Sequence, residues 1–129
     1  MIEGFEKQTK ELSDYERNTL LPIMCKCFKN HRGKENAITN SLICEKMTAK
    51  GYDISDTRVR KIINHIRTYH LVPRLMATNQ GYYITDSPSE LNTYLQSLIG
   101  RRDAIQEVIN AVKIQYEELQ TNRKNDKKF

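Results

Sequence analysis

The large apolar residues in the C-terminal third of the chain recur at alternating intervals of four and three positions. They are Leu91, Leu95, Leu98, Ile105, Ile109, Val112, Tyr116 and Leu119, and Arg102 occupies the remaining place in the series. This spacing is that of the a and d positions of a coiled coil. A continuous helix over residues 87–121 would be about 50 Å long at 1.5 Å per residue. A single small domain cannot cover such a helix, so the pattern predicts either a partner helix or a break.

Both outcomes are compatible with the residues in the middle of this segment. Gly100 costs about 1 kcal/mol relative to alanine in a helix, so the helix could break there and its second half fold back. We favour a coiled-coil homodimer over such a break, because a small domain cannot cover a helix of this length. Arg102 and Gly100 interrupt the seam near its centre, and parallel and antiparallel pairing both stay open.

A second helical pattern covers residues 55–69. Ser55 can cap its N-terminus, and Asp56 is favourable in the first turn. A buried stripe at the i, i+3, i+4, i+7 spacing is formed by Val59, Ile62, Ile63 and Ile66. At 100° per residue the opposite face is centred on Thr57, Lys61, Asn64 and Thr68, with Arg60 and Arg67 along one side and Arg58 and His65 along the other. This face carries the residue types that contact phosphates and base edges, although an ordinary solvent-exposed helix could look the same.

The neighbouring segments favour a helix that contacts nucleic acid over an ordinary solvent-exposed helix. Ser13 and Glu16 form a capping box that opens a first helix, in which Pro22 predicts a kink or a start nearer Asn18. Residues 31–36 are expected to be a loop. Thr39 then caps a second helix that ends at Gly51, and a tight turn leads into the basic helix. Two β-type runs follow, over residues 70–77 and 81–85, joined by a turn. A helix, a tight turn, a basic helix and a hairpin in this order are typical of a helix-turn-helix unit followed by a β-hairpin.

The run from Ile38 through Thr85 resembles winged helix-turn-helix DNA-binding domains. The residues that carry the resemblance are Ile54, Ser55, Val59, Arg60, Ile66, His70, Leu71, Val72, Gly81, Tyr82 and Tyr83. The chain is also similar to small winged-helix proteins of bacteriophages and other bacterial mobile elements. The resemblance implies a mainly α fold with a small β-hairpin (α+β), with the winged helix-turn-helix domain over residues 13–86. It further implies a recognition helix at residues 55–69 in the major groove and a wing at residues 75–85 on the backbone or minor groove.

The charge of the chain is concentrated in the same region. The net charge of +5 is modest, but residues 55–74 hold five basic groups against one acidic group, an excess of four. A localised basic patch is a better indicator of nucleic-acid binding than the total. The expected DNA-contacting residues are Thr57, Arg58, Arg60, Lys61, Asn64, Arg67, Thr68, Arg74, Asn79 and Gln80.

Each of these side chains has an expected role. Asn64 suits bidentate contact with adenine, and Arg58 or Arg60 suits contact with guanine. Lys61 can reach either a base or a phosphate. Late in the region, Arg67 and Arg74 suit phosphates, while Thr57 lies near the helix start, where backbone N–H groups can hold a phosphate. The wing-tip residues Asn79 and Gln80 are also common in turns.

Other classes of protein find little support in the sequence. It has no catalytic motif of the familiar hydrolase, metalloprotease or P-loop types, so we do not expect an enzyme, a cofactor or a small-molecule ligand. Cys25, Cys27 and Cys44 have no disulfide or zinc spacing, and no metal site is expected. With no apolar run of about 18 residues and no signal-peptide pattern, we expect no membrane association and a cytoplasmic location.

The sequence therefore predicts a sequence-specific double-stranded DNA-binding protein, either a transcriptional regulator or an accessory DNA-processing factor. Residues 1–12 are expected to be a flexible N-terminus and residues 122–129 a disordered basic tail. The alternative is a protein-interaction winged helix that docks onto a larger assembly such as replication machinery. The two differ in which surface should bind: the basic helix face in the first, the heptad face or the rim of the wing in the second.

Overall fold

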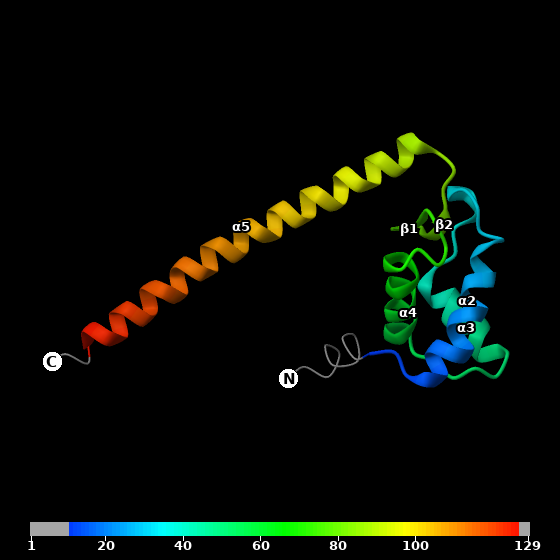
Figure 1. The fold of residues 1–129 in the computed structure, drawn as a ribbon, viewed down its shortest axis with the longest axis horizontal. Coiled ribbons are helices and arrows are strands. Elements are labelled where there is room, and N and C mark those ends of the chain that lie inside the picture. Colours follow the sequence, from blue (N-terminus) through cyan, green and yellow to red (C-terminus); the bar gives the residue numbers. More distant parts are fainter. Residues whose placement is uncertain (1–10, 127–129) are drawn as a thin grey trace. The chain divides into compact units, whose positions relative to one another are not determined.

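A computed structural model of the chain describes residues 11–126, which divide into two units between Leu91 and Asn92 (Figure 1). The first unit contains η1 (Glu16–Leu20), α2 (Leu21–Phe28), η2 (Lys34–Asn36), α3 (Asn40–Ala49), α4 (Asp56–Thr68), β1 (Leu75–Thr78) and β2 (Gly81–Ile84). The helix α5 (Pro88–Asp126) begins in the first unit and forms the second. The predicted combination of a mainly helical chain, a small antiparallel hairpin and a long C-terminal helix is confirmed.

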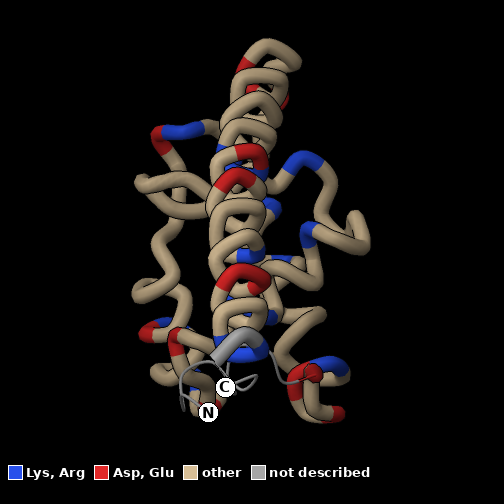
Figure 2. Tube along the Cα trace, turned by 90° about the vertical axis from the view of Figure 1, so that its left-hand side faces the viewer, with Lys and Arg blue, Asp and Glu red and all other residues tan. Residues whose placement is uncertain are grey.

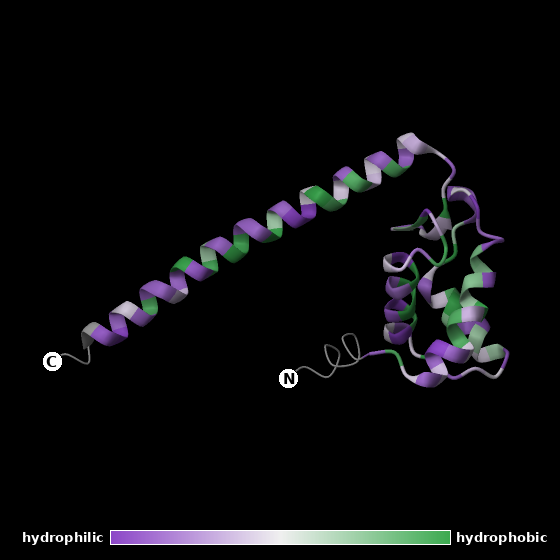
Figure 3. Cartoon of the chain, viewed as in Figure 1, coloured by the Kyte–Doolittle hydropathy of each residue, from purple (hydrophilic) through white to green (hydrophobic). Residues whose placement is uncertain are grey.

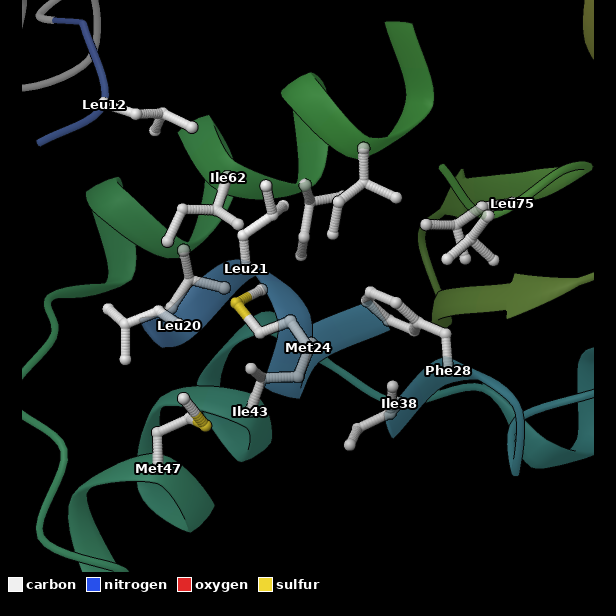
Figure 4. Close-up of a cluster of buried hydrophobic side chains, with 14 of the residues drawn as sticks. Leu12, Leu20, Leu21, Met24, Phe28, Ile38, Ile43, Met47, Ile62 and Leu75 are labelled. Atoms are coloured by element: carbon white, nitrogen blue, oxygen red, sulfur yellow. The ribbon is translucent and has the colours of Figure 1, made fainter. Parts of the chain in front are cut away.

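The core of the first unit lies between α2, α3, α4 and the hairpin (Figure 4). The predicted stripe of α4 is buried: Val59, Ile62 and Ile66 have no exposed surface and Ile63 has 2%. Figure 3 shows α4 apolar on the side facing the rest of the unit and hydrophilic on the other. Burying each such side chain contributes about 1.5–3 kcal/mol, so this stripe fixes which face of α4 points outward.

The first helix accommodates its proline by a local change of winding. The capping box forms as predicted, with the Ser13 N–H donating to Glu16 Oε1 at 2.8 Å and the Glu16 N–H donating to Ser13 Oγ at 3.1 Å. The helical segment begins at Asp14, so the expected start near Asn18 is wrong. Pro22 lies in the first turn of α2, directly after the π-helical turn η1. Because proline has no N–H to donate, the hydrogen-bond ladder is interrupted here, and a widened turn is one way to absorb the interruption.

The segment from His31 to Ile38, expected to be a plain loop in its first part, pairs with the hairpin. Isolated bridges join Arg32 to Ile84 and Ile38 to Tyr82. The Ile38 pairing is reciprocal, with N···O distances of 3.0 and 2.8 Å. Gly81 permits it, since its φ is +120° and a Cβ there would lie 2.5 Å from the Ile38 carbonyl oxygen. The hairpin is thus attached to the segment that leads into α3.

The hairpin itself is shorter than the sequence suggested. We expected an extended run from His70, but β1 begins at Leu75. His70 and Arg74 have positive φ values of 58° and 62°. The chain therefore turns twice between α4 and β1 instead of entering the strand directly.

The second unit is one uninterrupted helix. α5 continues through Gly100 to Asp126, so the break considered near Gly100 does not occur. Residues 122–126, expected to belong to a disordered tail, are helical, and the rest of that tail and residues 1–10 lie outside the described residues. Ser87 caps the helix by accepting from the Glu90 N–H at 3.1 Å. The Glu90 carboxylate does not return to the cap but accepts from the Tyr83 hydroxyl at 2.6 Å, which ties the first turn of α5 to β2.

Candidate nucleic-acid interface

The outer face of α4 is positioned by its cap and by its buried stripe. Ser55 Oγ accepts from the Arg58 N–H at 3.2 Å and fixes where the helix begins. Of the expected contact residues on this face, Arg60, Asn64 and Thr68 are exposed, and Thr57, Lys61 and Arg67 are partly exposed. Residues three or four apart lie on one side of a helix, so Arg60, Lys61 and Asn64 form one continuous surface.

Arg58 does not belong to that surface, and the expectation that it reads a base has to be corrected. Its guanidinium forms a bidentate ion pair with Glu16, with both N···O distances 2.7 Å, and also donates to the Glu11 carbonyl at 3.0 Å. The two side chains are only 14% and 10% exposed. Arg58 therefore joins the start of α4 to the first helix, because the fold brings a carboxylate to it from 42 residues away.

The ion pair changes the titration of both partners. The hydrogen bond from Arg58 is the largest effect on Glu16 and holds the pKa of its carboxyl below the ordinary value of 4.5, against the opposing effect of burial. The hydrogen bond to Glu16 likewise raises the pKa of Arg58. Both groups are thus charged at neutral pH and neutralise each other at this end of α4.

Arg74 also has a partner within the fold. Its Nε donates to the Thr85 carbonyl at 2.9 Å, and its Nη2 lies 3.1 Å from Asp86 Oδ1. Asp86 is shared with Arg32, whose Nη1 is 3.5 Å away. Because the Arg74 guanidinium braces the end of the hairpin, the phosphate contact expected of it would have to compete with these bonds.

The remaining expected contact residues lie in two places, on α4 and at the turn of the hairpin. Thr68 donates its hydroxyl to the Asn64 backbone carbonyl at 2.7 Å, a bond within the helix, and Asn64 itself is exposed. Asn79 and Gln80 form the exposed turn of the hairpin, where the Gln80 N–H donates to Thr78 Oγ1 at 3.2 Å. The structure thus brings Arg60, Lys61 and Asn64 together on α4 and keeps Asn79 and Gln80 at the hairpin tip.

Asn40 positions the interface, and the sequence did not single it out for this role. Its Nδ2 donates to the Asp56 carbonyl at 3.0 Å, and its Oδ1 accepts from the Tyr82 hydroxyl at 3.2 Å. One side chain at the start of α3 therefore holds the start of α4 and the hairpin. Nothing local in the sequence marks Asn40 for this, because both partners are distant in the chain.

Exposed aromatic surface at the end of α4 was also not expected. Tyr69 is 64% exposed, and its ring centroid lies 4.4 Å from that of His65. Leu71, directly after, is 46% exposed. This pair of rings, tilted by 34° to each other, offers contact area for a ligand beside the basic helix face.

Comparison with protein families, with curated proteins and with solved structures gives no match to this chain. Within residues 11–126 no three His, Cys, Asp or Glu side chains are arranged to hold a metal ion. None of the helices in that range is long and apolar enough to pass through a membrane.

Proposed function

We propose that the first unit is a winged helix that binds double-stranded DNA in a sequence-specific manner. In this proposal α3 and α4 form the helix-turn-helix, α4 enters the major groove, and the hairpin is the wing. A major groove about 12 Å wide accepts one helix, and its base edges present a distinct donor and acceptor pattern.

The observation that carries the proposal is the contrast between paired and unpaired cations. Arg32, Arg58, Arg74 and Arg102 each form an ion pair within the described residues. Arg60 and Lys61, on the outer face of α4, take part in none of them. A surface whose cations lack carboxylate partners attracts an external polyanion, whereas a merely solvated helix face commonly carries charges of both signs.

In this proposal Asn64 is the residue that reads a base. It lies one turn after Arg60 and Lys61, and its exposed amide can donate and accept at once, as adenine requires. Arg60 is the guanine-reading candidate that remains after Arg58 is assigned to its ion pair. Lys61 and Arg67 are assigned to phosphates or base edges, Thr57 and the helix start to phosphate, and Asn79 and Gln80 to the backbone or minor groove.

The protein would act as a homodimer joined through α5, as a cytoplasmic transcriptional regulator or accessory DNA-processing factor. The seam residues are exposed along the second unit, with Leu95 at 50%, Ile109 at 51% and Tyr116 at 59%. Apolar surface of this extent on one helix face is characteristic of an interface that a partner covers.

Selection from a random-sequence duplex library tests the proposal. The wild-type protein should enrich a defined motif, and the triple variant Arg60→Ala, Lys61→Ala, Asn64→Ala should not. The control variant Lys46→Ala, Lys50→Ala also removes two positive charges, but from exposed positions in α3 and at its C-terminus. It should keep the motif. Asn64→Ala alone should relax selection at one base by about 1–3 kcal/mol. A motif that survives the triple variant would refute the assignment of α4.

A protein-interaction module is the second candidate, favoured by the exposed seam of α5. In that case Arg60, Lys61 and Asn64 should be dispensable, and binding to a larger assembly should depend on seam residues such as Ile105 and Val112. Purified protein that enriches no DNA and does not bind duplex DNA would decide for this candidate.

A further inference from the structure

A groove between α2 and α3 is not used by the DNA-binding proposal. It encloses about 520 Å³, which is within the range of sites that hold a drug-sized ligand, so it can accept side chains of a partner. None of its lining residues belongs to α4, β1 or β2. The groove is therefore a second surface of the first unit, and its ligand is a separate question from DNA binding.

The floor of the groove is apolar and comes from both helices. α3 contributes Ile43 and Met47, one turn apart, and α2 contributes Met24, which lies near Ile43 (Figure 4). Met24 is 1% exposed, Ile43 3% and Met47 5%. Ile23 and Cys27, one turn apart on α2, also line the groove and are partly exposed. Because methionine is unbranched and flexible, a floor with two methionines can adapt to the shape of an apolar side chain that packs on it.

The edges of the groove carry lysines. Lys46 lies in α3, Lys50 follows one turn later at its C-cap, and Lys26 lies on α2; all three are exposed. Lys and Arg residues occur in many parts of the first unit (Figure 2), so the number of lysines does not distinguish this groove. The distinguishing feature is that no Asp or Glu is among the described residues that line it. Apolar surface edged only by cations is complementary to a ligand that is apolar on one face and acidic beside it.

The spacing of two of the lysines fits a helix. Residues one turn apart, such as Lys46 and Lys50, have Cβ atoms about 5–6 Å apart, and a second helix presents carboxylates at the same interval from positions i and i+4. α3 has 10 residues, or about 15 Å at 1.5 Å per residue, so a partner helix of similar length can lie along it. Amphipathic helices bind apolar grooves through residues at i, i+3, i+4 and i+7.

We propose that the groove between α2 and α3 binds an acidic amphipathic helix of a partner protein. The apolar face of that helix packs on Ile23, Met24 and the rest of the floor, and two of its carboxylates, one turn apart, pair with Lys46 and Lys50. This inference goes beyond the proposed DNA binding and does not depend on it, because the groove shares no residue with the outer face of α4.

A display library of helical peptides of about 15 residues, long enough for a helix to form, is the probe. The full-length protein should enrich peptides with an apolar stripe and two carboxylates one turn apart. Lys46→Glu, Lys50→Glu should weaken binding of an enriched peptide at least about tenfold, because like charges then face each other. The same variant should bind the peptide in which these two carboxylates are replaced with lysine. This exchange distinguishes direct pairing from a loss of folding.

A matched control and a footprint locate the binding site. Arg17→Glu, Lys34→Glu makes the same change in net charge at exposed positions outside the groove and should bind the peptide like the wild type. Cys27 lines the groove and is partly exposed. In a background with Cys25→Ala and Cys44→Ala, the enriched peptide should slow alkylation of the Cys27 thiol severalfold.

The inference is overturned if no peptide is enriched, if the enriched peptides lack paired carboxylates, or if Cys27 reacts equally fast with and without the peptide. Three other results overturn it by assigning the groove differently. Protection of Cys27 by decanoate, with no enriched peptide, would indicate a small organic anion. A changed oligomeric state of the free protein with Lys46→Glu, Lys50→Glu would indicate a second copy of this chain. Loss of the selected DNA motif with Lys46→Ala, Lys50→Ala would assign these lysines to DNA.

Discussion

Arg58 and Arg60 lie two positions apart on α4, and the structure assigns them opposite roles. Arg58→Ala removes two hydrogen bonds of 2.7 Å to Glu16 and one of 3.0 Å to the Glu11 carbonyl, and leaves a carboxylate that is 10% exposed. Removing one partner of a buried ion pair costs about 3–5 kcal/mol. Because Glu16 keeps the bond from the Ser13 N–H, we expect the low end, about 3 kcal/mol.

This loss should be visible in thermal unfolding of the first unit. One kcal/mol corresponds to about 4–8 °C in a domain of this size, so Arg58→Ala should lower the Tm by roughly 12–24 °C. Arg60→Ala, exposed and outside the ion pairs, should change stability by less than about 0.5 kcal/mol but weaken binding to the selected duplex by about 1–3 kcal/mol. The measurements are circular dichroism melts at one protein concentration and fluorescence anisotropy below the melting range.

The reasoning is refuted if the two variants exchange behaviour, or if Arg58→Ala melts within about 2 °C of the wild type. A double-mutant cycle with Glu16→Gln separates the pair from other effects of the substitution. The two single losses should be clearly non-additive, because each variant already removes the same interaction.

Three further outcomes follow from the same structure. Because the pKa of Glu16 is held below 4.5 in the folded state, the stability gap between the wild type and Arg58→Ala should be full above that pH and shrink as the pH falls through the lowered pKa, as urea titrations near pH 7 and near pH 3 would measure. Gly81→Ala should destabilise the first unit by at least about 2 kcal/mol in urea, since its Cβ would meet the Ile38 carbonyl oxygen at 2.5 Å and its φ is +120°. Gly100→Ala should instead stabilise α5 by about 1 kcal/mol, seen as a higher melting midpoint of its helical signal, because nothing lies within 4 Å of the new Cβ.

Local patterns in the sequence predicted the helices and their caps well. The bonds of Ser13, Thr39 and Ser55 to the backbone N–H groups near their helix starts were all expected from residue type and spacing. The buried stripe of α4 was likewise expected, since a period of 3.6 residues is a property of the segment alone. Continuity of α5 through Gly100 could not be decided from propensity, because about 1 kcal/mol is small for a helix of 39 residues.

Contacts between distant segments could not be predicted in this way. The partner of Arg58 is 42 residues away, and the same separation divides Asn40 from Tyr82. The bridges between residues 31–38 and β2 depend on where the hairpin lies, which no single segment determines. The expected DNA contacts therefore included Arg58 and Arg74 without foreseeing their partners Glu16 and Asp86, and the role of Asn40 was missed.

The pairing of Arg58 with Glu16 and of Arg74 with Asp86 has a consequence for how salt should affect binding. Of the five cations between residues 55 and 74, Arg58 has a buried carboxylate partner and Arg74 an exposed one that Arg32 shares, so Arg60, Lys61 and Arg67 are the best placed to displace counterions from DNA. Each phosphate neutralised contributes about −0.9 to the slope of log K against log salt concentration. We therefore expect a slope from α4 no steeper than about −2.7 per binding unit, rather than the −4.5 or so that five cations would give. With so shallow an electrostatic contribution, discrimination between duplexes falls mainly to Asn64 and Arg60.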